Sequence, residues 1–119
     1  LKIASKAAEN GDAKAQYNIA KIYEEGTGVK KDMTKALEWY RKAAEQGHVV
    51  SQYKLASALL NGDGIKKSAK DAADWFRKSA DKDYGPSQFP LGLMYKDGVG
   101  TGKDERQAVK WLEKAAAKG

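Results

Sequence analysis

The sequence contains no cysteine, a single histidine and only two prolines among its 119 residues. Without cysteine the chain cannot form a disulfide framework, and His48 alone cannot supply the ligands of a tetrahedral zinc site. No stretch approaches the roughly 18 apolar residues that a membrane-spanning helix needs. We therefore expect no metal, no cofactor and no membrane insertion.

Charged residues of both signs are abundant. The 22 Lys and Arg exceed the 16 Asp and Glu, which gives a net charge of +6 at pH 7. Acidic and basic residues are interleaved along the chain, and a solvated helical surface explains this pattern at least as well as a nucleic-acid interface does. The charge balance alone gives no reason to expect a nucleic-acid partner.

The dominant feature of the sequence is an internal repeat of 36 residues. Eight positions carry the same residue in all three units, far more than accidental agreement would produce. They are Ala8, Ala44 and Ala80; Gln16, Gln52 and Gln88; Gly26, Gly62 and Gly98; Gly28, Gly64 and Gly100; Lys31, Lys67 and Lys103; Ala36, Ala72 and Ala108; Trp39, Trp75 and Trp111; and Lys42, Lys78 and Lys114. The chain is therefore predicted to be an array of similar structural units.

One unit contains two helical patterns separated by a loop with two glycines. Apolar residues recur three or four apart over residues 13–25, which predicts a first helix, here named helix A, ending at Gly26. Asp32 is a suitable N-cap for a second helix, helix B, over residues 33–46. Two antiparallel helices with a short connection form a hairpin. Helix B is predicted to bury the residues Ala36, Leu37, Trp39, Tyr40, Ala43 and Ala44.

The tryptophans of helix B are predicted to be core residues. Burying about 200 Å² of each indole contributes roughly 5 kcal/mol as an upper estimate. Loss of Trp75, in the middle unit, is therefore expected to unfold the array. The alternative, that Trp39, Trp75 and Trp111 stack on nucleic-acid bases, is disfavoured because the three indoles recur in strict register.

The register of the repeat sets the expected boundaries. Residues 1–7 close a preceding unit, 8–43, 44–79 and 80–115 form repeats 1 to 3, and 116–119 open a following unit. We expect a segment of a longer array. Such a segment should expose apolar helix faces near Ile3 at one end and near Trp111 and Ala115 at the other. These faces would favour end-to-end association.

The third unit departs from the other two. Asp83 replaces Gly11 and Gly47, and Pro86 and Pro90 both fall in the opening turns of the expected helix. A proline in the first turn is tolerated, whereas Pro90 removes a backbone hydrogen bond and crowds the carbonyl of Pro86. We predict that this helix begins late, near Ser87, or is kinked at that point.

The repeat resembles a known family. The pattern AxAQYxLAxxYxxGxGVxxD, matched over residues 13–32, and KAxxWYxKAA, matched over residues 35–44, are similar to the Sel1-like repeats, relatives of the tetratricopeptide repeats. The resemblance covers essentially the whole chain. It implies an all-α solenoid, a right-handed superhelix of antiparallel helical hairpins with the A helices on the concave face. Family members look like adaptors that hold other proteins together. They do so in bacterial envelope, virulence and signalling settings and in the eukaryotic quality control of secreted proteins.

Two motifs imitate catalytic sites. The stretch Asp97–Glu105 resembles a phosphate-binding loop, but it lacks the preceding strand, the first glycine and the Ser or Thr after Lys103. Ser51 and Lys54 have the spacing of a penicillin-recognising enzyme, and cysteine-rich relatives have been discussed as β-lactamases. Ser51 aligns with Ala15 and Ser87, however, so the position simply requires a small residue. We find no catalytic group of residues.

Adjacent carboxylates such as Glu24 and Glu25 diverge on a helix and do not suit acid and base catalysis. His48 occupies the position of Asp12, where it is expected either to cap the next helix or to be exposed.

The candidate binding residues lie on one stripe of the A helices, at positions that the repeat leaves variable. We call this set the A-helix stripe. It comprises Lys14, Asn18, Lys21 and Glu25 in repeat 1; Val50, Lys54, Ser57 and Asn61 in repeat 2; and Pro86, Pro90, Leu93 and Asp97 in repeat 3. Tyr17, Tyr53 and Leu93 are expected to provide apolar anchors beside it.

Three functions are compatible with this pattern. The first is a non-enzymatic module that binds a protein or peptide on the concave face. The second is a helical-repeat RNA-binding protein, although Lys21, Ser57 and Leu93 share no chemistry that could form a base code. The third is a β-lactamase-like hydrolase, which is supported only by the spacing of Ser51 and Lys54.

Overall fold

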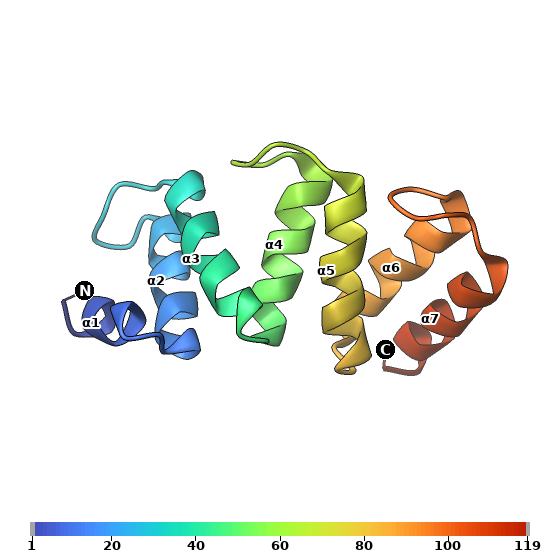
Figure 1. The fold of residues 1–119 in the computed structure, drawn as a ribbon, viewed down its shortest axis with the longest axis horizontal. Coiled ribbons are helices and arrows are strands. Elements are labelled where there is room, and N and C mark those ends of the chain that lie inside the picture. The colour runs from blue at the N-terminus through green and yellow to red at the C-terminus, as the bar shows by residue number, and fades with distance from the viewer. Residues whose placement is uncertain (1, 119) are drawn as a thin grey trace.

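The protein is an elongated row of helices (Figure 1). The computed structural model describes residues 2–118, and the side chains from Lys6 onward. These residues form seven helices and no strand, within an envelope of 47 × 26 × 22 Å. The helices are α1 (Lys2–Glu9), α2 (Ala13–Glu25), α3 (Met33–Glu45), α4 (Val49–Asn61), α5 (Ala69–Asp81), α6 (Gly85–Asp97) and α7 (Glu105–Lys118).

Each helix packs on the next helix along the chain. The pairs α2 and α3, α4 and α5, and α6 and α7 form hairpins, while α3 packs on α4 and α5 on α6 to join successive hairpins. Helix α1 packs on α2 as the last helix of a hairpin would. The arrangement confirms the all-α solenoid of helical hairpins with a 36-residue period.

The sequence predicted the helix ends of the first unit to within one residue. Helix α2 spans residues 13–25, and α3 begins at Met33 after the N-cap Asp32, whose side chain accepts a hydrogen bond from the amide of Lys35 at 3.1 Å. Ser68 caps α5 in the same way. These side chains accept hydrogen bonds from backbone amides that have no partner inside the helix, and they therefore fix where each B helix starts.

The two loop glycines have different roles. Gly26, Gly62 and Gly98 end their A helices in the left-handed conformation, with φ of +73°, +72° and +69°. The second glycine permits a close approach between units, since a Cβ at Gly100 would lie 2.2 Å from the carbonyl oxygen of Ala69. The loop of one repeat therefore rests on the start of the preceding B helix.

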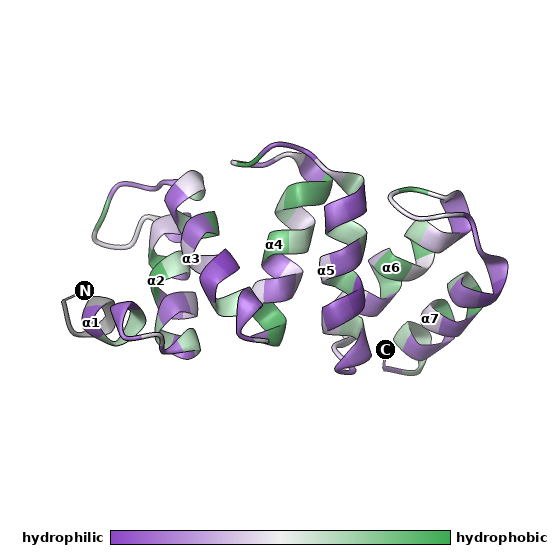
Figure 2. Cartoon of the chain, in the orientation of Figure 1, coloured by the Kyte–Doolittle hydropathy of each residue, from purple (hydrophilic) through white to green (hydrophobic). Residues whose placement is uncertain are grey.

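The core runs along the axis of the row. Its largest members include Tyr40, Phe76, Leu55 and Leu91, each at most 1% exposed. Small residues such as Ala36 and Ala72, both fully buried, allow the helix axes to come close. Figure 2 shows that hydrophobic and hydrophilic residues are interleaved along the helices, as expected when each helix buries only one side.

The predicted burial of the tryptophans is correct for Trp111 alone. Trp111 is 3% exposed, whereas Trp39 and Trp75 are only half-buried. Successive side chains of a helix point about 100° apart. Because Tyr40 and Phe76 point into the core, the tryptophan that precedes each of them lies at the edge of the core. One lysine covers each of these two indoles. The Nζ atom of Lys42 lies 4.4 Å from the centre of the Trp39 ring, and that of Lys78 lies 5.5 Å from the centre of the Trp75 ring.

The predicted exposure at the end of repeat 3 is therefore wrong for Trp111. The Nζ atoms of Lys110 and Lys114 lie 4.7 and 5.3 Å from the centre of its ring, and α6 packs on α7. Ala115 is half-buried. The side chain of Ile3, the other residue of this prediction, lies outside the described residues.

The prediction of a late start for the first helix of repeat 3 is also wrong. Helix α6 begins at Gly85 and has 13 residues, like α2 and α4. Pro86 lies in the first turn, where its missing amide has no intrahelical acceptor. Pro90 lies inside the helix, but Ser87, Gln88 and Leu91 are completely buried, so tertiary packing keeps this segment helical.

A buried glutamine links each A helix to the preceding helix. Gln16 Nε2 donates to the carbonyl oxygen of Ala8 at 3.1 Å, Gln52 Nε2 to that of Ala44 at 3.1 Å, and Gln88 Nε2 to that of Ala80 at 3.5 Å. The acceptors belong to the last turn of a helix, where carbonyls have no intrahelical donor. The repeated glutamine thus has a structural role that the sequence analysis did not assign.

We predict that Phe76, and not Trp75, is the residue on which the middle unit depends. Phe76→Ala removes a ring that is 1% exposed and leaves a cavity, which costs about 3–5 kcal/mol. Trp75→Ala removes a half-buried ring at the edge of the core, where solvent can fill the space. Urea unfolding of both variants should show the larger loss for Phe76→Ala, and the reverse order would contradict this assignment.

Candidate functional site

The A-helix stripe of repeat 1 faces solvent. Lys14, Asn18 and Glu25 are exposed, and Lys21 is half-buried. The ammonium group of Lys21 lies 3.8 Å from the Glu25 carboxylate and 5.9 Å from the centre of the Tyr17 ring. Such contacts between solvent-exposed groups are weak in water and hold the charged groups of α2 only loosely.

The A helices of repeats 1 and 2 are joined by an ion pair that the sequence analysis missed. Lys54 of α4 lies 3.5 Å from Glu24 of α2, and both side chains are about one third exposed or less, at 32% and 26%. Glu24 also accepts a hydrogen bond from the hydroxyl of Tyr40. Burial, and then this hydrogen bond, raise the pKa of Tyr40 above its ordinary value of 10.0. Lys54 is therefore engaged within the chain and is less free than the lysines of α2.

The second junction has a different chemistry at the same positions. One repeat further along, Leu60 stands in place of Glu24, Phe76 in place of Tyr40 and Pro90 in place of Lys54. The stripe there comprises the half-buried Ser57, Pro90 and Leu93, and ends at the exposed residues Asn61 and Asp97. The stripe thus changes from charged at the first junction to a mixture of apolar residues, Pro90 and Leu93, and polar residues at the second.

The tyrosines proposed as apolar anchors are packed between repeats. The Tyr17 ring lies 4.8 Å from His48 and 5.8 Å from Tyr40, measured between ring centres. Tyr53 packs in the same way, at 5.7 Å from Tyr84 and 6.1 Å from Phe76. These rings are half-buried at the seams between units, so most of their surface is already used in the fold.

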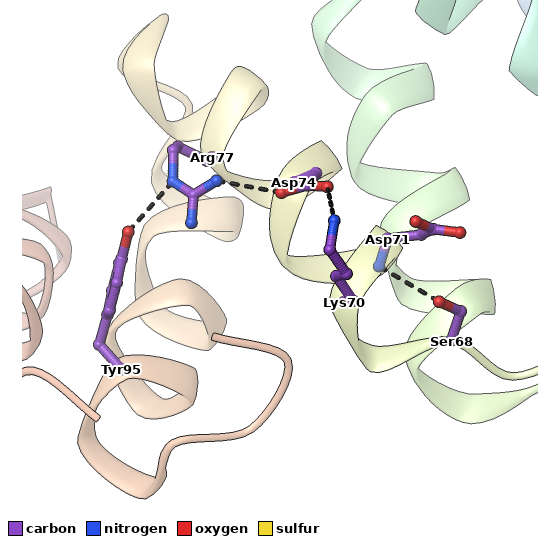
Figure 3. A network of polar contacts seen from close by, with 6 residues as sticks. All are labelled: Ser68, Lys70, Asp71, Asp74, Arg77 and Tyr95. Atoms are coloured by element: carbon purple, nitrogen blue, oxygen red, sulfur yellow. Dashed lines mark hydrogen bonds and ion pairs between the residues drawn. The ribbon is translucent and has the colours of Figure 1, made fainter. Parts of the chain in front are cut away.

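A second polar network lies on α5 (Figure 3). Arg77 donates to the hydroxyl of Tyr95 at 3.1 Å and to Asp74 at 3.2 Å, and Asp74 also pairs with Lys70 at 3.5 Å. Because Tyr95 belongs to α6, Arg77 ties the second hairpin to the third. This network supports the stacking of units and contains no arrangement suited to catalysis.

Ser51 is not placed to act as a nucleophile. Its side chain is completely buried, and its hydroxyl lies 2.8 Å from Nδ1 of His48. The same Nδ1 accepts a hydrogen bond from the Ser51 amide at 3.3 Å, which makes His48 the N-cap of α4, as predicted. The serine and histidine therefore form a helix cap, and the hydrolase interpretation loses its only motif.

The glycine-rich stretch Asp97–Glu105 is the connection between α6 and α7. Gly98 ends α6, and Asp104 caps α7 by accepting from the amide of Gln107 at 3.1 Å. A phosphate-binding loop follows a strand, whereas this loop follows a helix. It is the same turn that joins the helices of the other two hairpins.

Among the described residues, no three side chains of His, Asp or Glu come together in a way that could hold a metal ion. None of the described helices is long and apolar enough to cross a membrane.

Comparison with protein families matches the Sel1 repeat three times, at residues 13–48, 49–84 and 85–119. The chain belongs to the Sel1 repeat family. Each matched segment opens at the first residue of an A helix, α2, α4 or α6. Proteins of this family are generally non-enzymatic helical-repeat scaffolds and commonly act as protein-interaction modules.

Several solved structures resemble this Sel1 repeat chain, and three of them are described here. A Sel1 repeat protein from Oxalobacter formigenes has a TM-score of 0.88 and 34% identity over 92% of this chain. The protein c5321, a protective antigen of uropathogenic Escherichia coli with an SLR fold, has a TM-score of 0.91 and 37% identity over 99%. Cysteine-rich protein B of Helicobacter pylori has a TM-score of 0.72 and 26% identity over 99%.

The matches differ in their own length. This chain spans 45% of the Oxalobacter protein, 25% of c5321 and 90% of the Helicobacter protein. No curated protein matches the sequence significantly.

We predict that the His48 cap makes stability fall in mild acid. Burial lowers the pKa of His48 below its ordinary 6.5, so the unfolded chain binds more protons than the folded chain. The contribution of the cap to the free energy of unfolding is complete above pH 6.5. It is lost as the pH falls through the lower pKa that His48 has in the folded chain. His48→Asn keeps an N-cap oxygen that does not titrate in this range. Urea unfolding between pH 4.5 and 7.5 should show wild type weakening relative to this variant as the pH falls, and parallel profiles would contradict the assignment.

Proposed function

We propose that this Sel1 repeat chain is a non-enzymatic interaction module that binds a protein or peptide on the concave face formed by its A helices. The observation that carries the proposal is the combination of a fixed core with a variable, exposed A-helix stripe. Lys14, Asn18, Glu25, Asn61 and Asp97 are exposed on helices that the repeat holds in one row. A row of rigid helices loses little conformational entropy when a partner binds to it.

The change of chemistry along the stripe supports a directional partner. The first junction offers the Lys21 and Glu25 charges beside the Glu24 and Lys54 pair, and the second offers Leu93 and Pro90. An extended peptide or a helix with charged residues at one end and apolar residues at the other would match both halves. Electrostatic contacts would set its direction, and apolar contacts would supply most of the affinity.

We predict that charge reversal on α2 weakens binding. Peptides selected from a random display library against the wild-type chain should bind Lys14→Glu with Lys21→Glu about tenfold more weakly, because two cations of the stripe become anions. Arg41→Glu with Lys70→Glu is the matched control, since it makes the same change of net charge at exposed sites of the B helices α3 and α5. Equal losses in both double variants would show that net charge, and not the stripe, governs binding.

The RNA-binding alternative makes a separate prediction. Retention on heparin or RNA by several lysine contacts to phosphates would fall steeply with salt concentration. The equivalent stripe positions Lys21, Ser57 and Leu93 do not repeat one chemistry, so we expect weak retention and a shallow salt dependence. A steep slope that the Lys14 and Lys21 double variant reduces would favour RNA over a protein partner.

A further inference from the structure

A polar pocket lies in the middle of the row, where α3 and α5 end and α4 begins (Figure 1). Helix α2 packs on α3 and α6 packs on α5, so the pocket is flanked by a further helix on each side. Its volume is about 580 Å³, and none of its lining residues belongs to the A-helix stripe. The lining includes Glu45, Gln52, Trp75, Lys78, Asp81 and Lys82.

Gln52 contributes to this pocket a buried hydrogen-bond acceptor that has no donor. The side chain is 3% exposed, and its Nε2 donates to the carbonyl oxygen of Ala44 at 3.1 Å. Because a carbonyl oxygen can only accept, this bond fixes the orientation of the side-chain amide. Among the described residues no donor reaches Oε1 of Gln52. A buried acceptor without a hydrogen bond is costly, so a ligand that donates to it gains affinity.

The first junction shows which chemical group satisfies this acceptor. There the equivalent glutamine, Gln16, accepts a hydrogen bond from Nε2 of Gln46 at 2.9 Å. One repeat further along, Lys82 stands in place of Gln46, and its ammonium group donates to the carbonyl oxygen of Gly47 at 2.8 Å. Because Lys82 lines the pocket, the equivalence indicates that Oε1 of Gln52 is approached from the pocket side.

The rest of the lining has nearly the same chemistry at the two junctions. Glu9, Trp39, Lys42 and Glu45 stand at the first junction in place of Glu45, Trp75, Lys78 and Asp81. The exchange of Gln46 for Lys82 therefore decides whether the chain satisfies the acceptor itself.

The third junction is arranged differently. Asp83 stands there in place of Gly47, accepts a second hydrogen bond from Nε2 of Gln88 at 3.3 Å and pairs with Lys118 at 2.8 Å. Oε1 of Gln88 also lacks a donor among the described residues, but this ion pair gives its surroundings another chemistry. The second junction is therefore the one with an acceptor in a pocket of otherwise repeated composition.

The pocket favours a neutral polar group with a short aliphatic stem. Its lining contains two lysines, Lys78 and Lys82, and two carboxylates, Glu45 and Asp81, so the formal charges cancel. An ion would be desolvated there without a net opposite charge to compensate it. The half-buried indole of Trp75 offers an apolar wall for methylene groups. A glutamine side chain combines a primary carboxamide with two such methylenes.

We propose that this pocket binds a glutamine side chain of a partner protein, whose carboxamide donates to Oε1 of Gln52 and whose methylenes pack on Trp75. The partner supplies the group that Gln46 supplies from within the chain at the first junction. A glutamate is rejected because an ionised carboxylate has no donor and would place a second acceptor against Oε1. The pocket thus reads one residue of the partner.

The test uses two probes of equal size, N-acetylglutamine methylamide and N-acetylglutamate methylamide, with the intact chain at pH 7. The indole N–H signals of Trp39, Trp75 and Trp111 in nitrogen-15 NMR give one reporter in each repeat, and Trp75→Phe assigns the middle one. The glutamine probe should shift the Trp75 signal with a Kd of about 1 mM, as expected for so small a ligand. The glutamate probe should bind about tenfold more weakly.

Reciprocal variants locate the site. Lys82→Gln introduces the residue of the first junction, so its own carboxamide should occupy Gln52 and weaken the glutamine probe about tenfold. Lys82→Met removes the same charge without adding a donor and should retain the affinity within about twofold. Gln46→Lys should create a second site, seen as a shift of the Trp39 signal. Circular dichroism confirms that each variant folds.

Three outcomes would overturn the proposal. Equal affinity for the two probes would remove the carboxamide as the recognised group, and equal losses in the two Lys82 variants would make the lysine charge the determinant. An unshifted Trp75 signal at about 50 mM glutamine probe would leave solvent water as the donor to Gln52. Acetamide that binds as tightly as the glutamine probe would assign the pocket to a small amide in place of a glutamine side chain.

The outcome is independent of the A-helix stripe. The Lys14 and Lys21 double variant should bind the glutamine probe as wild type does, and peptides selected on the stripe should bind the Lys82→Gln variant normally. Either proposal can therefore fail while the other stands.

Discussion

The hydrogen bond from a buried glutamine amide to the last turn of the preceding helix is the contact on which regular stacking depends. An α-helix ends with carbonyls that have no internal donor, and a helix end inside a core must find one. Gln16, Gln52 and Gln88 provide it at the same place in each unit. The same carbonyl also accepts a hydrogen bond from a backbone amide of the following turn; the amide of Gly47, for example, donates to the carbonyl of Ala44 at 2.9 Å. Each helix end is therefore held in a single position.

A seam fixed in this way leaves other positions free to vary. The same backbone carries an ion pair between Glu24 and Lys54 at the first junction, and Leu60 and Pro90 at the second. Pro90 shows how far this tolerance extends. It lies inside α6, yet the helix keeps its length because Gln88 and Leu91, on the buried side, hold the segment in register. Surface chemistry can therefore differ from repeat to repeat without changing the fold.

The sequence was a good guide wherever one residue type serves one local purpose. Asp32 and Ser68 cap helices, and Gly26 and Gly62 end them, so the bounds of α2 and α3 followed from local pattern alone. It was a poorer guide to the depth of burial. Trp75 and Phe76 are neighbours on one helix and both look like core residues, and only the crossing of α4 and α5 decides which of them faces inward.

The candidate site divides in the same way. The periodicity predicted the stripe from Lys14 to Asp97, because positions four and three apart share a helix face. It did not identify the Glu24 and Lys54 pair, since this pair depends on which helix lies alongside α2. By itself the sequence determined the repeat, its period and the order of its helices, all of which follow from contacts within one unit. Only the tertiary structure decided which side chains meet across the seams, because those contacts join residues about 30 positions apart and exist only once the units have packed.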